Sequence, residues 1–497
     1  MDWIVISGYI LLVIYVCSLI YVTLFCLMQL HLLYKYLFRN NVDTNIYFKN
    51  INGENDLPFV TIQLPIYNEK YVVQKLIDNI VLFDYPKDKF EIHILDDSTD
   101  ETTGIIADKV SEYKKKGFHI ELITRTNRSG FKAGALREGM TRAKGEYIAI
   151  FDADFLPKPD FLKQTLSAFK DPKVGVVQTR WEHINQHFSL LTELQAFQLN
   201  VHFTIEQLGR YKAGYMLQFN GTAGIWRKSC ILDAGGWEAD TLTEDLDLSY
   251  RAQLKGWKIS YMQNVTAPAE LPAEINGLKS QQFRWMKGGA ETARKMLPKI
   301  WSSHLSLLLK FHATVHLLSS SIFIFVFMMS IVSLPLLFLL SSIKPLPENF
   351  HVFFISLLSV ILVYYHANVN VAWPKENKLK MILKFIFIFP VFLALSMALA
   401  FHNSLAVIQG FLGLKSSFVR TPKYGFSKIN KDLTKSSYFS KSLNKVALGE
   451  GFLSICFFMA VYFGWYYNLL DFWVFHLLLA CGYLILFIYA IQSKLSR

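Results

Sequence analysis

The sequence predicts an α/β domain with a mainly parallel sheet, inserted between α-helical transmembrane segments. The 497 residues are 52% hydrophobic and only 18% charged, a balance that is typical of membrane proteins. The apolar residues are concentrated in long runs near both ends, whereas residues 55–296 have the mixed composition of a soluble domain. Within this middle part, short β-rich runs alternate with helical stretches, which indicates strands joined by helices in one sheet.

The first apolar run, residues 3–28, predicts an N-terminal membrane anchor. It is longer than the apolar core of a secretory signal, has the acidic Asp2 in place of a basic start, and is followed by Lys35 and Arg39. Because basic residues stay on the cytoplasmic side, we expect residues 1–35 to form a transmembrane helix that enters from outside. The domain that follows, residues 50–300, is then cytoplasmic, at the plasma or inner membrane.

The C-terminal part predicts further membrane helices and one cytoplasmic loop. Eight Lys or Arg residues lie between 415 and 445, and positive loops stay in the cytoplasm. A full crossing by the run 381–412, which Pro390 interrupts, would place this loop outside. We therefore expect that run to lie in the interface or to re-enter, with a sixth true crossing as the alternative. The apolar runs are 312–340, 350–371, 381–412, 448–469 and 472–491, and they divide this part into transmembrane and interfacial helices (301–414), a cytoplasmic loop (415–446) and a transmembrane hairpin (447–497).

Acidic residues follow three of the predicted strands. Glu69 comes after the first strand, Asp96 and Asp97 follow the second, and Asp152 and Asp154 follow the fourth. Ligands of parallel α/β sheets bind beyond the carboxyl ends of the strands, so we expect these side chains to share one site. The predicted strands are residues 60–65, 91–95, 120–124, 147–151 and 174–178, and the predicted helices include residues 72–83 and 132–141.

The pair Asp152 and Asp154 predicts a metal site. One residue separates them at a strand end, so a short turn can direct their carboxylates to a common hard cation. So few oxygen ligands suit Mg²⁺ or Mn²⁺ held jointly with substrate phosphates. A solvated turn or a helix cap is the alternative. Of the other pair we expect Asp97 to contact the ligand, while Ser98 or Asp100 caps the next helix.

Three further motifs carry candidate chemistry. Lys132 lies in a stretch of small and basic residues that suits a diphosphate bound by backbone N–H groups and an ammonium. Residues 243–245 (Thr-Glu-Asp) fit a helix N-terminus, but they also offer Asp245 as the base that takes a proton from an acceptor hydroxyl. Residues 281–285 (Gln-Gln-Phe-Arg-Trp) supply a guanidinium for phosphate and an indole for a sugar ring, with an interfacial anchor as the alternative.

Four motifs follow one another along the chain: Asp96-Asp97, Asp152-x-Asp154, Thr243-Glu244-Asp245 and Gln281-x-x-Arg284-Trp285. In this order they resemble the processive family 2 glycosyltransferases, which include cellulose and hyaluronan synthases. Residues 177–181, 219–224 and 254–258 look closest to the cellulose-synthase-like branch of glucomannan and xyloglucan-backbone synthases. The resemblance is strong over residues 58–296 and looser in the membrane part.

The resemblance implies a GT-A-type nucleotide-sugar-binding domain and a role for each motif. Asp154 and Asp152 would hold the metal, and Asp245 would be the base. Gln281, Arg284 and Trp285 would complete the catalytic group. The implied nucleotide-sugar contacts are Glu69, Asp97, Lys132 and Asp152, and the implied acceptor contacts are Phe219, Asn220, Gly221, Thr222, Glu244 and Trp285.

Residues 418–423 (Phe-Val-Arg-Thr-Pro-Lys) resemble the mobile gating loop, Phe-x-Val-Thr-x-Lys, of cellulose synthases. Arg420 stands where that loop has Val. The resemblance implies that Thr421 and Lys423 reach the nucleotide. This requires the segment to be cytoplasmic, as the charge pattern also predicts.

Together these expectations describe an inverting, metal-dependent membrane glycosyltransferase. It would transfer glucose or mannose from UDP-glucose or GDP-mannose to a growing β-linked polysaccharide, processively and coupled to translocation, with accessory export subunits left open as partners. The alternative is a non-processive enzyme with a lipid acceptor. A transporter or channel is disfavoured because the membrane runs are short of acids and bases. The net charge of +12 is concentrated beside those runs, which fits the lipid bilayer and not a nucleic acid.

Overall fold

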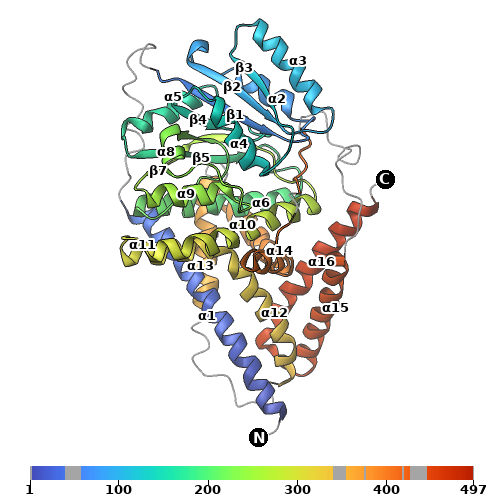
Figure 1. Cartoon of the computed structure of the whole chain (residues 1–497). Coiled ribbons are helices and arrows are strands. Elements are labelled where there is room, and N and C mark those ends of the chain that lie inside the picture. Colours follow the sequence, from blue (N-terminus) through green and yellow to red (C-terminus); the bar gives the residue numbers. More distant parts are fainter. Residues whose placement is uncertain are drawn as a thin grey trace.

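The computed structural model describes residues 3–39, 57–339, 354–373, 377–416, 419–425 and 445–495. Figure 1 shows three tiers: a sheet domain, a layer of helices beneath it, and apolar helices that extend away from the sheet. Two segments of the predicted topology, residues 341–349 and residues 426–444 of the basic loop, lie outside the described residues.

The sheet has seven strands in the order β3-β2-β1-β4-β6-β5-β7. β6 runs antiparallel to both β4 and β5, and the other neighbouring strands are parallel. The predicted mainly parallel sheet is therefore confirmed. The five predicted strands correspond to β1–β5, whereas β6 and β7 are absent from the prediction. The strands are β1 (Val60–Ile66), β2 (Phe90–Asp96), β3 (Ile120–Thr124), β4 (Tyr147–Ile150), β5 (Val174–His183), β6 (Gly224–Arg227) and β7 (Lys258–Ala269).

Both faces of the sheet are buried under apolar side chains. Along β4, Ala149 belongs to one apolar cluster, and Ile148 and Ile150 belong to the other. Because side chains alternate between the faces of a strand, a strand buried on both faces reads as a continuous apolar run. The helices and short 3-10 turns of the sheet domain are α2 (Val73–Ile80), η3 (Lys87–Lys89), α3 (Thr102–Lys115), α4 (Phe131–Arg142), α5 (Phe161–Leu166), η4 (Ser167–Lys170), α8 (Lys228–Asp233) and α9 (Glu244–Leu254).

A layer of helices separates the sheet from the apolar helices (Figure 1). α6 (Leu190–Val201) begins with a capping box between Ser189 and Thr192. It continues through the π-helical turn η5 (His202–Glu206) into α7 (Gln207–Ala213). α10 (Ile275–Trp301) and α11 (Leu307–Leu317) complete the layer.

Among the described residues, six helices are long and apolar enough to cross a membrane, and the protein is an integral membrane protein. The predicted run 312–340 is divided, because α11 ends at Leu317 before the membrane-length helix begins. His312 in α11 stacks on Tyr215 of the sheet domain, so the start of this run is part of a domain contact. The six are α1 (Trp3–Phe38), η6 (Ser319–Ser321) with α12 (Ile322–Leu339), α13 (Phe354–Tyr365) with η9 (His366–Ala372), α14 (Lys378–Leu412), α15 (Lys445–Tyr466), and α16 (Trp473–Leu495), which follows the 3-10 turn η11 (Leu470–Phe472).

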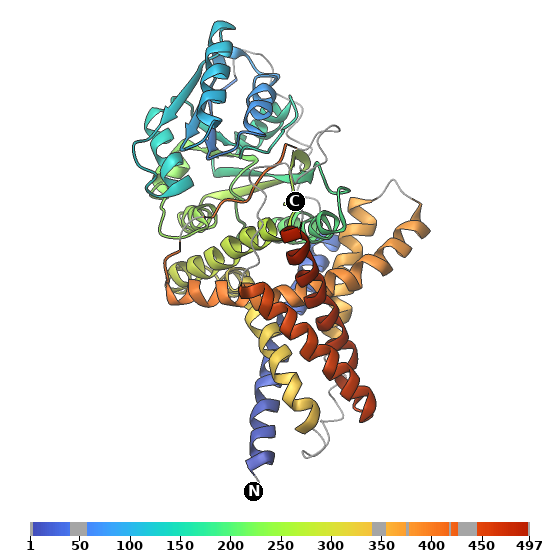
Figure 2. The same ribbon diagram turned by 90° about the vertical axis from the view of Figure 1, so that its right-hand side faces the viewer.

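α14 differs from the other long helices in its direction. α1, α12, α15 and α16 extend away from the sheet domain, whereas α14 runs crosswise beneath α10 (Figure 2). α10 and α14 approach closely, since a methyl group on Gly410 would lie 2.5 Å from the carbonyl oxygen of Lys287. His402 Nε2 also lies 3.0 Å from the carbonyl oxygen of Lys279. α14 is therefore held along α10 over several turns.

A buried ion pair joins α10 to α15. Lys279 Nζ lies 2.6 Å from Glu450 Oε2, and the two side chains are 5% and 0% exposed. Desolvation of two charges is offset by their mutual attraction only while both are present. The pair therefore fixes the position of α10 against the C-terminal hairpin.

We expect either single substitution, Lys279→Met or Glu450→Leu, to reduce stability by about 3–5 kcal/mol, because each leaves one buried charge without its partner. The double variant, which replaces the pair by apolar side chains, should recover most of that loss. Thermal unfolding of the detergent-purified protein measures the effect. A double variant as unstable as the sum of the singles would show that the two charges do not act as a pair.

Candidate active site

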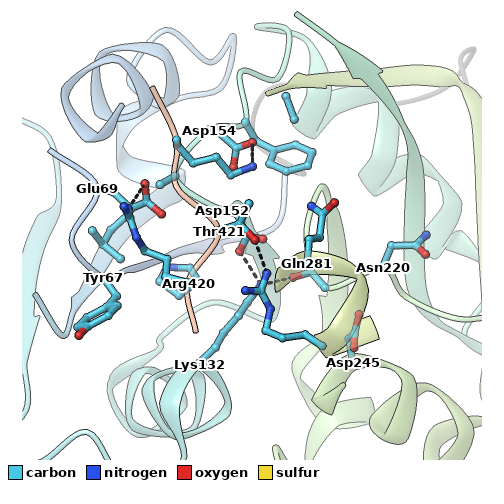
Figure 3. Close-up of a pocket in the computed structure, with 18 of the residues that line it drawn as sticks. Tyr67, Glu69, Lys132, Asp152, Asp154, Asn220, Asp245, Gln281, Arg420 and Thr421 are labelled. Atoms are coloured by element: carbon cyan, nitrogen blue, oxygen red, sulfur yellow. Dashed lines mark hydrogen bonds and ion pairs between the residues drawn. The ribbon is translucent and has the colours of Figure 1, made fainter. Parts of the chain in front are cut away.

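The carboxyl ends of β1, β2 and β4 meet at a cleft with a cavity volume of about 230 Å³ (Figure 3). Glu69, Asp97, Asp152 and Asp154 all line it, so four of the five strand-end acids of the prediction share one cleft, and Asp96 does not line it. The other predicted site residues that line the cleft are Lys132, Asn220, Gly221, Glu244, Asp245, Gln281, Arg284, Trp285, Thr421 and Lys423.

Two predicted acceptor contacts, Phe219 and Thr222, lie behind the cleft wall. Phe219 is fully buried and meets Trp226 edge-on, with ring centroids 5.4 Å apart. Thr222 is also buried, and its Oγ1 accepts a hydrogen bond of 2.8 Å from the backbone N–H of Asp152. In this structure both residues shape the wall from behind, Thr222 by fixing the backbone of Asp152.

Lys132 is the second residue of α4. The helix begins after Gly130, which has the left-handed conformation. Lys132 Nζ is 2.5 Å from Asp152 Oδ1 and 3.0 Å from the carbonyl oxygen of Gly221. Burial opposes the charge, but Asp152 and Glu244 outweigh it and raise the pKa of Lys132. A permanent cation thus stands at a helix N-terminus, where the helix dipole adds to its attraction for an anion.

Asp245 lies in the first turn of α9, after Thr243. The Thr243 hydroxyl pairs with the hydroxyl of Thr292 at 3.1 Å and does not cap the helix, which was the alternative role of this motif. Burial and the neighbouring Glu244 raise the pKa of Asp245 to about 7, although Lys132 opposes the shift. A carboxylate with a pKa near neutrality is suited to accept a proton from a substrate.

Asp154 and Asp152 are each held against a lysine. The side chain of Asp154 is 3% exposed, and its Oδ2 accepts hydrogen bonds from Lys423 Nζ at 2.6 Å and from the N–H of Glu270 at 3.0 Å. Each carboxylate therefore already binds a cation, and the donor set is all oxygen. The two residues fit a site for Mg²⁺ or Mn²⁺ that shares its ligands with phosphate oxygens.

A second acidic group in the described part of the chain consists of Glu238, Asp240 and Asp247. Lys295 Nζ reaches all three carboxylates, at 2.6, 2.8 and 3.0 Å. Arg251 also pairs with Asp247 at 2.8 Å, so cations from α9 and α10 already bind this group, and these acids act as a structural link between the two helices. The group was not among the predicted metal ligands.

Residues 419–425 close one side of the cleft. Arg284 donates hydrogen bonds to Thr421 Oγ1 at 2.8 Å and to the carbonyl oxygen of Val419. Arg420 pairs with Glu69 Oε2 at 2.8 Å. Burial raises the pKa of Glu69 to about 8 against the opposing charge of Arg420, and burial lowers the pKa of Arg284 to about 10, so the arginine remains charged at neutral pH. Phe418, the first residue of the predicted gating loop, lies outside the described residues.

Sequence reasoning missed two charged residues of this site. Arg125 binds both carboxylate oxygens of Asp97, with Nε 2.9 Å from Oδ1. Glu270 accepts hydrogen bonds at Oε2 from the N–H groups of Tyr424 and Gly425, at 3.0 and 3.3 Å. Arg125 comes directly after the predicted strand 120–124, which is a signal for the same sheet edge. Glu270 follows β7, and without that strand its sequence position carries no such signal.

Side-chain hydrogen bonds of Asp96 and Asp100 hold the turn between β2 and α3, and the N-cap residue of α3 is Glu101, whose side chain makes no capping bond. Asp96 accepts hydrogen bonds from the N–H of Ser98 at 3.0 Å and from Thr103 Oγ1 at 2.6 Å, so it shapes the turn. Asp100 Oδ1 accepts a hydrogen bond of 3.0 Å from the N–H of Thr102 at the start of α3. Asp97 alone of the two adjacent acids lines the cleft.

The mainly parallel sheet and its acidic cleft define a domain of the GT-A type. Residues 58–288, which include all seven strands, match the family described as "Glycosyltransferase like family 2", so this domain is similar to the family 2 glycosyltransferases.

Similar proteins include two from Arabidopsis thaliana. Glucomannan 4-beta-mannosyltransferase 7 is 42% identical over 253 residues, which are 50% of this chain and 46% of that protein. Glucomannan 4-beta-mannosyltransferase 2 is 38% identical over 302 residues, 58% of this chain and 57% of that protein. The chain thus spans about half the length of the curated relatives that it matches.

One solved structure shares the fold. The mannosyltransferase PcManGT from Pyrobaculum calidifontis, in complex with GDP-Man and Mn²⁺, superposes with a TM-score of 0.52 at 20% sequence identity. The superposition covers 74% of this chain and 100% of that chain. At this identity the likeness is evidence for the fold alone.

Gly221 tests how tightly the cleft is built around Asp245. It has a φ of +78°, and a methyl group there would lie 3.1 Å from Asp245 Oδ2. Gly214 has a similar φ of +70° but open space around it, so it is a matched control. Both Gly→Ala variants should lose about 1–2 kcal/mol of stability from backbone strain, as thermal unfolding will show. Only Gly221→Ala should also lose sugar transfer, and equal activity in the two variants would contradict the close approach to Asp245.

Proposed function

We propose that the protein transfers a hexose, with mannose the first candidate, from a nucleotide sugar to a β-linked glycan, with inversion at the anomeric carbon. The observation that carries the proposal is the convergence on one cleft of a base with a raised pKa, a lysine at a helix N-terminus and a buried arginine. These are Asp245, Lys132 and Arg284. They match the three needs of glycosyl transfer from a diphosphate: proton removal and two cations for the leaving group.

The reaction proposed is a single displacement. A hydroxyl oxygen of the acceptor attacks the anomeric carbon while the bond from that carbon to the diphosphate oxygen breaks. Asp245 takes the hydroxyl proton, and the nucleoside diphosphate leaves with the bonding electron pair. Lys132 and Arg284 stabilise the negative charge that develops on the diphosphate, and an α-linked donor gives a β-linked product.

Asp154 and Asp152 are the residues that would hold Mg²⁺ or Mn²⁺, which would neutralise diphosphate charge when bound. In the structure the ammonium groups of Lys423 and Lys132 occupy these carboxylates. Donor binding therefore requires these lysines to exchange their carboxylate partners for phosphate oxygens. This exchange gives residues 419–425 a role as a loop that covers the donor site and reopens.

The similar proteins favour mannose among the hexoses. The Arabidopsis relatives at about 40% identity are named glucomannan 4-beta-mannosyltransferases. The solved neighbour holds GDP-Man and Mn²⁺. We therefore place GDP-mannose ahead of UDP-glucose as donor, and a β-mannan or glucomannan chain as acceptor. Transfer of one sugar to a lipid carrier remains the second candidate, because α10, which lines the cleft with Gln281, Arg284 and Trp285, packs against the apolar helix α14.

The proposal also includes a location and a division into domains. The N-terminal end of α1 and the turn between α15 and α16 lie at the end of the molecule away from the sheet domain (Figures 1 and 2). This arrangement supports an N-terminal anchor, a cytoplasmic catalytic domain and a C-terminal transmembrane hairpin at the plasma or inner membrane. The crosswise course of α14 supports an interfacial helix between them, and hence five crossings.

Purified protein in liposomes, given labelled GDP-mannose or UDP-glucose with Mg²⁺ or Mn²⁺, tests the activity. We expect a β-linked polymer that a β-mannanase digests, and loss of the product on chelation. A lipid-linked single sugar would favour the second candidate. Absence of transfer from every nucleotide sugar offered to folded protein would overturn the proposal.

Asp245→Asn should retain donor affinity and lose transfer by about 10²-fold or more, because the amide cannot take the proton. In the unmodified protein Asp245 must be ionised to act. We therefore expect kcat/KM to fall as the pH drops through about 7 and to level off above it. Initial rates across the pH range measure this. A kcat/KM that does not change between about pH 5 and pH 8 would remove Asp245 from the role of base.

Two cysteine variants in a background without the native cysteines test the topology. Lys415 is exposed just after α14, and Tyr467 is exposed in the turn between α15 and α16. Because positive segments stay inside, Lys415→Cys should react with an impermeant thiol reagent only after cells are opened. Tyr467→Cys should react in intact cells. Labelling of Lys415→Cys in intact cells would exclude the interfacial placement of α14.

A further inference from the structure

Asn220 lines the cleft with one half of its amide already bonded. Its Oδ1 accepts a hydrogen bond from Gln218 Nε2 at 2.8 Å and lies 3.0 Å from His202 Nε2. Its backbone N–H donates to Gln178 Oε1 at 2.7 Å. Within the part of the chain that the structure describes, Nδ2 is buried and has no hydrogen-bond partner. A buried amide donor without a partner is rare in folded proteins and needs an explanation.

The orientation of this amide is held from one side by His202. His202 Nδ1 lies 2.9 Å from Glu206 Oε2. Burial alone would raise the pKa of Glu206, but the contacts with His202 and Arg210 lower it to about 2, so the carboxylate is ionised and accepts the Nδ1–H. Both ring nitrogens of His202 then face oxygens, and a ring protonated at both nitrogens donates Nδ1–H to Glu206 and Nε2–H to Asn220 Oδ1.

The amide is held from the other side by Gln218. His316 Nε2 lies 3.1 Å from Gln218 Oε1, and His316 Nδ1 lies 2.8 Å from the Tyr250 hydroxyl. Burial lowers the pKa of His316 well below its usual value, so the ring is neutral. When the Tyr250 hydroxyl donates to Nδ1, Nε2–H donates to Gln218 Oε1. The amide group of Gln218 is then left to donate to Asn220.

Each of these two chains of hydrogen bonds ends with an N–H group that faces Asn220 Oδ1. With His202 protonated at both nitrogens and Gln218 donating, a flip of the Asn220 amide would place its own NH₂ group against two N–H groups, so Asn220 Oδ1 is the atom that faces both donors. The backbone contributes as well, because His202 and Glu206 belong to the π-helical turn η5. Single π-turns inside α-helices occur frequently at functional sites, where they redirect side chains.

The position of Asn220 indicates what Nδ2 would meet. Asn220 precedes Gly221, which lies against the carboxylate of Asp245. In Figure 3, Asn220 and Asp245 lie together on one side of the cleft, and Glu69 and Arg420 lie on the other. A donor on the same side as the base faces the substrate that loses its proton, which is the acceptor sugar.

We propose that His202 and Gln218 are positioning residues that lock the amide of Asn220, so that its Nδ2 donates a hydrogen bond to an oxygen of the terminal acceptor sugar. The inference rests on the proposed function. It adds to that function two residues, His202 and Gln218, that act through Asn220 and touch no substrate. Because Oδ1 is already occupied, Asn220 offers the sugar a donor only. It therefore selects acceptors with a lone pair at that position.

The test compares four variants with the unmodified protein: Asn220→Ala, His202→Ala, Gln218→Met and His187→Ala. His187 is an exposed histidine whose hydrogen-bond partner is Gln186, and it serves as the matched control. The probes are the nucleotide sugar that the unmodified protein uses and a soluble β-1,4-linked manno-oligosaccharide. The first three variants should raise the KM for the oligosaccharide about tenfold, the effect of one lost hydrogen bond. The Kd for the donor should not change, and His187→Ala should match the unmodified protein.

A double variant separates positioning from general damage. If His202 acts through Asn220, adding His202→Ala to Asn220→Ala should raise the KM no further. Multiplied effects in the double variant, or a loss of donor affinity together with acceptor affinity, would overturn the proposal. If the unmodified protein transfers no sugar, the proposed function fails. If it transfers normally and His202→Ala behaves like His187→Ala, only the positioning role fails.

Discussion

Crowded negative charge at one edge of the sheet is the constraint on which this active site depends. Several carboxylates converge where the parallel strands end, and none of them can remain ionised there without a cation beside it. Arg125, Lys132, Arg420 and Lys423 supply those cations, each within hydrogen-bond distance of one acid. Because two of the four come from a segment near residue 420, the sheet domain alone does not complete the balance of charge.

The same balance of charge links the position of residues 419–425 to the binding of the nucleotide sugar. Lys423 lies against Asp154, the residue that would bind a metal, and Arg284 donates to the backbone and side chain of the loop. A nucleotide diphosphate with its metal would bring both negative and positive charge to these positions. The lysine and the arginine could then exchange protein partners for phosphate oxygens at little net electrostatic cost. Because each cation exchanges one oxygen partner for another, the closed and open positions of such a loop differ little in free energy.

Much of the sheet and of the acidic cleft was predictable because both leave local marks in the sequence. The five predicted strands are mainly apolar runs, and acids follow three of them closely. β6 and β7 are less apparent in the sequence: β6 has four residues, and β7 mixes polar and apolar residues without regular alternation. The break at residues 318–321 was missed because Leu and Ser there continue an apolar run. Only the packing of His312 on Tyr215 shows that α11 is a separate helix.

The hydrogen-bond chains behind Asn220 were unpredictable for a different reason. His202, Gln218 and His316 are far apart in sequence, and each has an ordinary packed or surface role as its simplest interpretation. Their meaning depends on which oxygen faces which nitrogen, and only coordinates supply that. The π-helical turn that directs His202 also leaves no residue signature, since its extra residue is a property of the backbone.

α10 connects the chemistry to the membrane part. A methyl group on Gly288 would lie 2.5 Å from Thr243 Cγ2, at the start of the helix that carries Asp245. The neighbouring residue Lys287 meets Gly410 of α14 through its backbone, and Lys279, farther toward the start of α10, pairs with Glu450 of α15. α10 thus lies in contact with the helix that carries Asp245 on one side and with the apolar helices α14 and α15 on the other. Because well-packed interfaces transmit displacement instead of absorbing it, a shift of α14 or α15 would move Arg284 and Asp245 together, and the geometry of the cleft depends on how these helices sit in the bilayer.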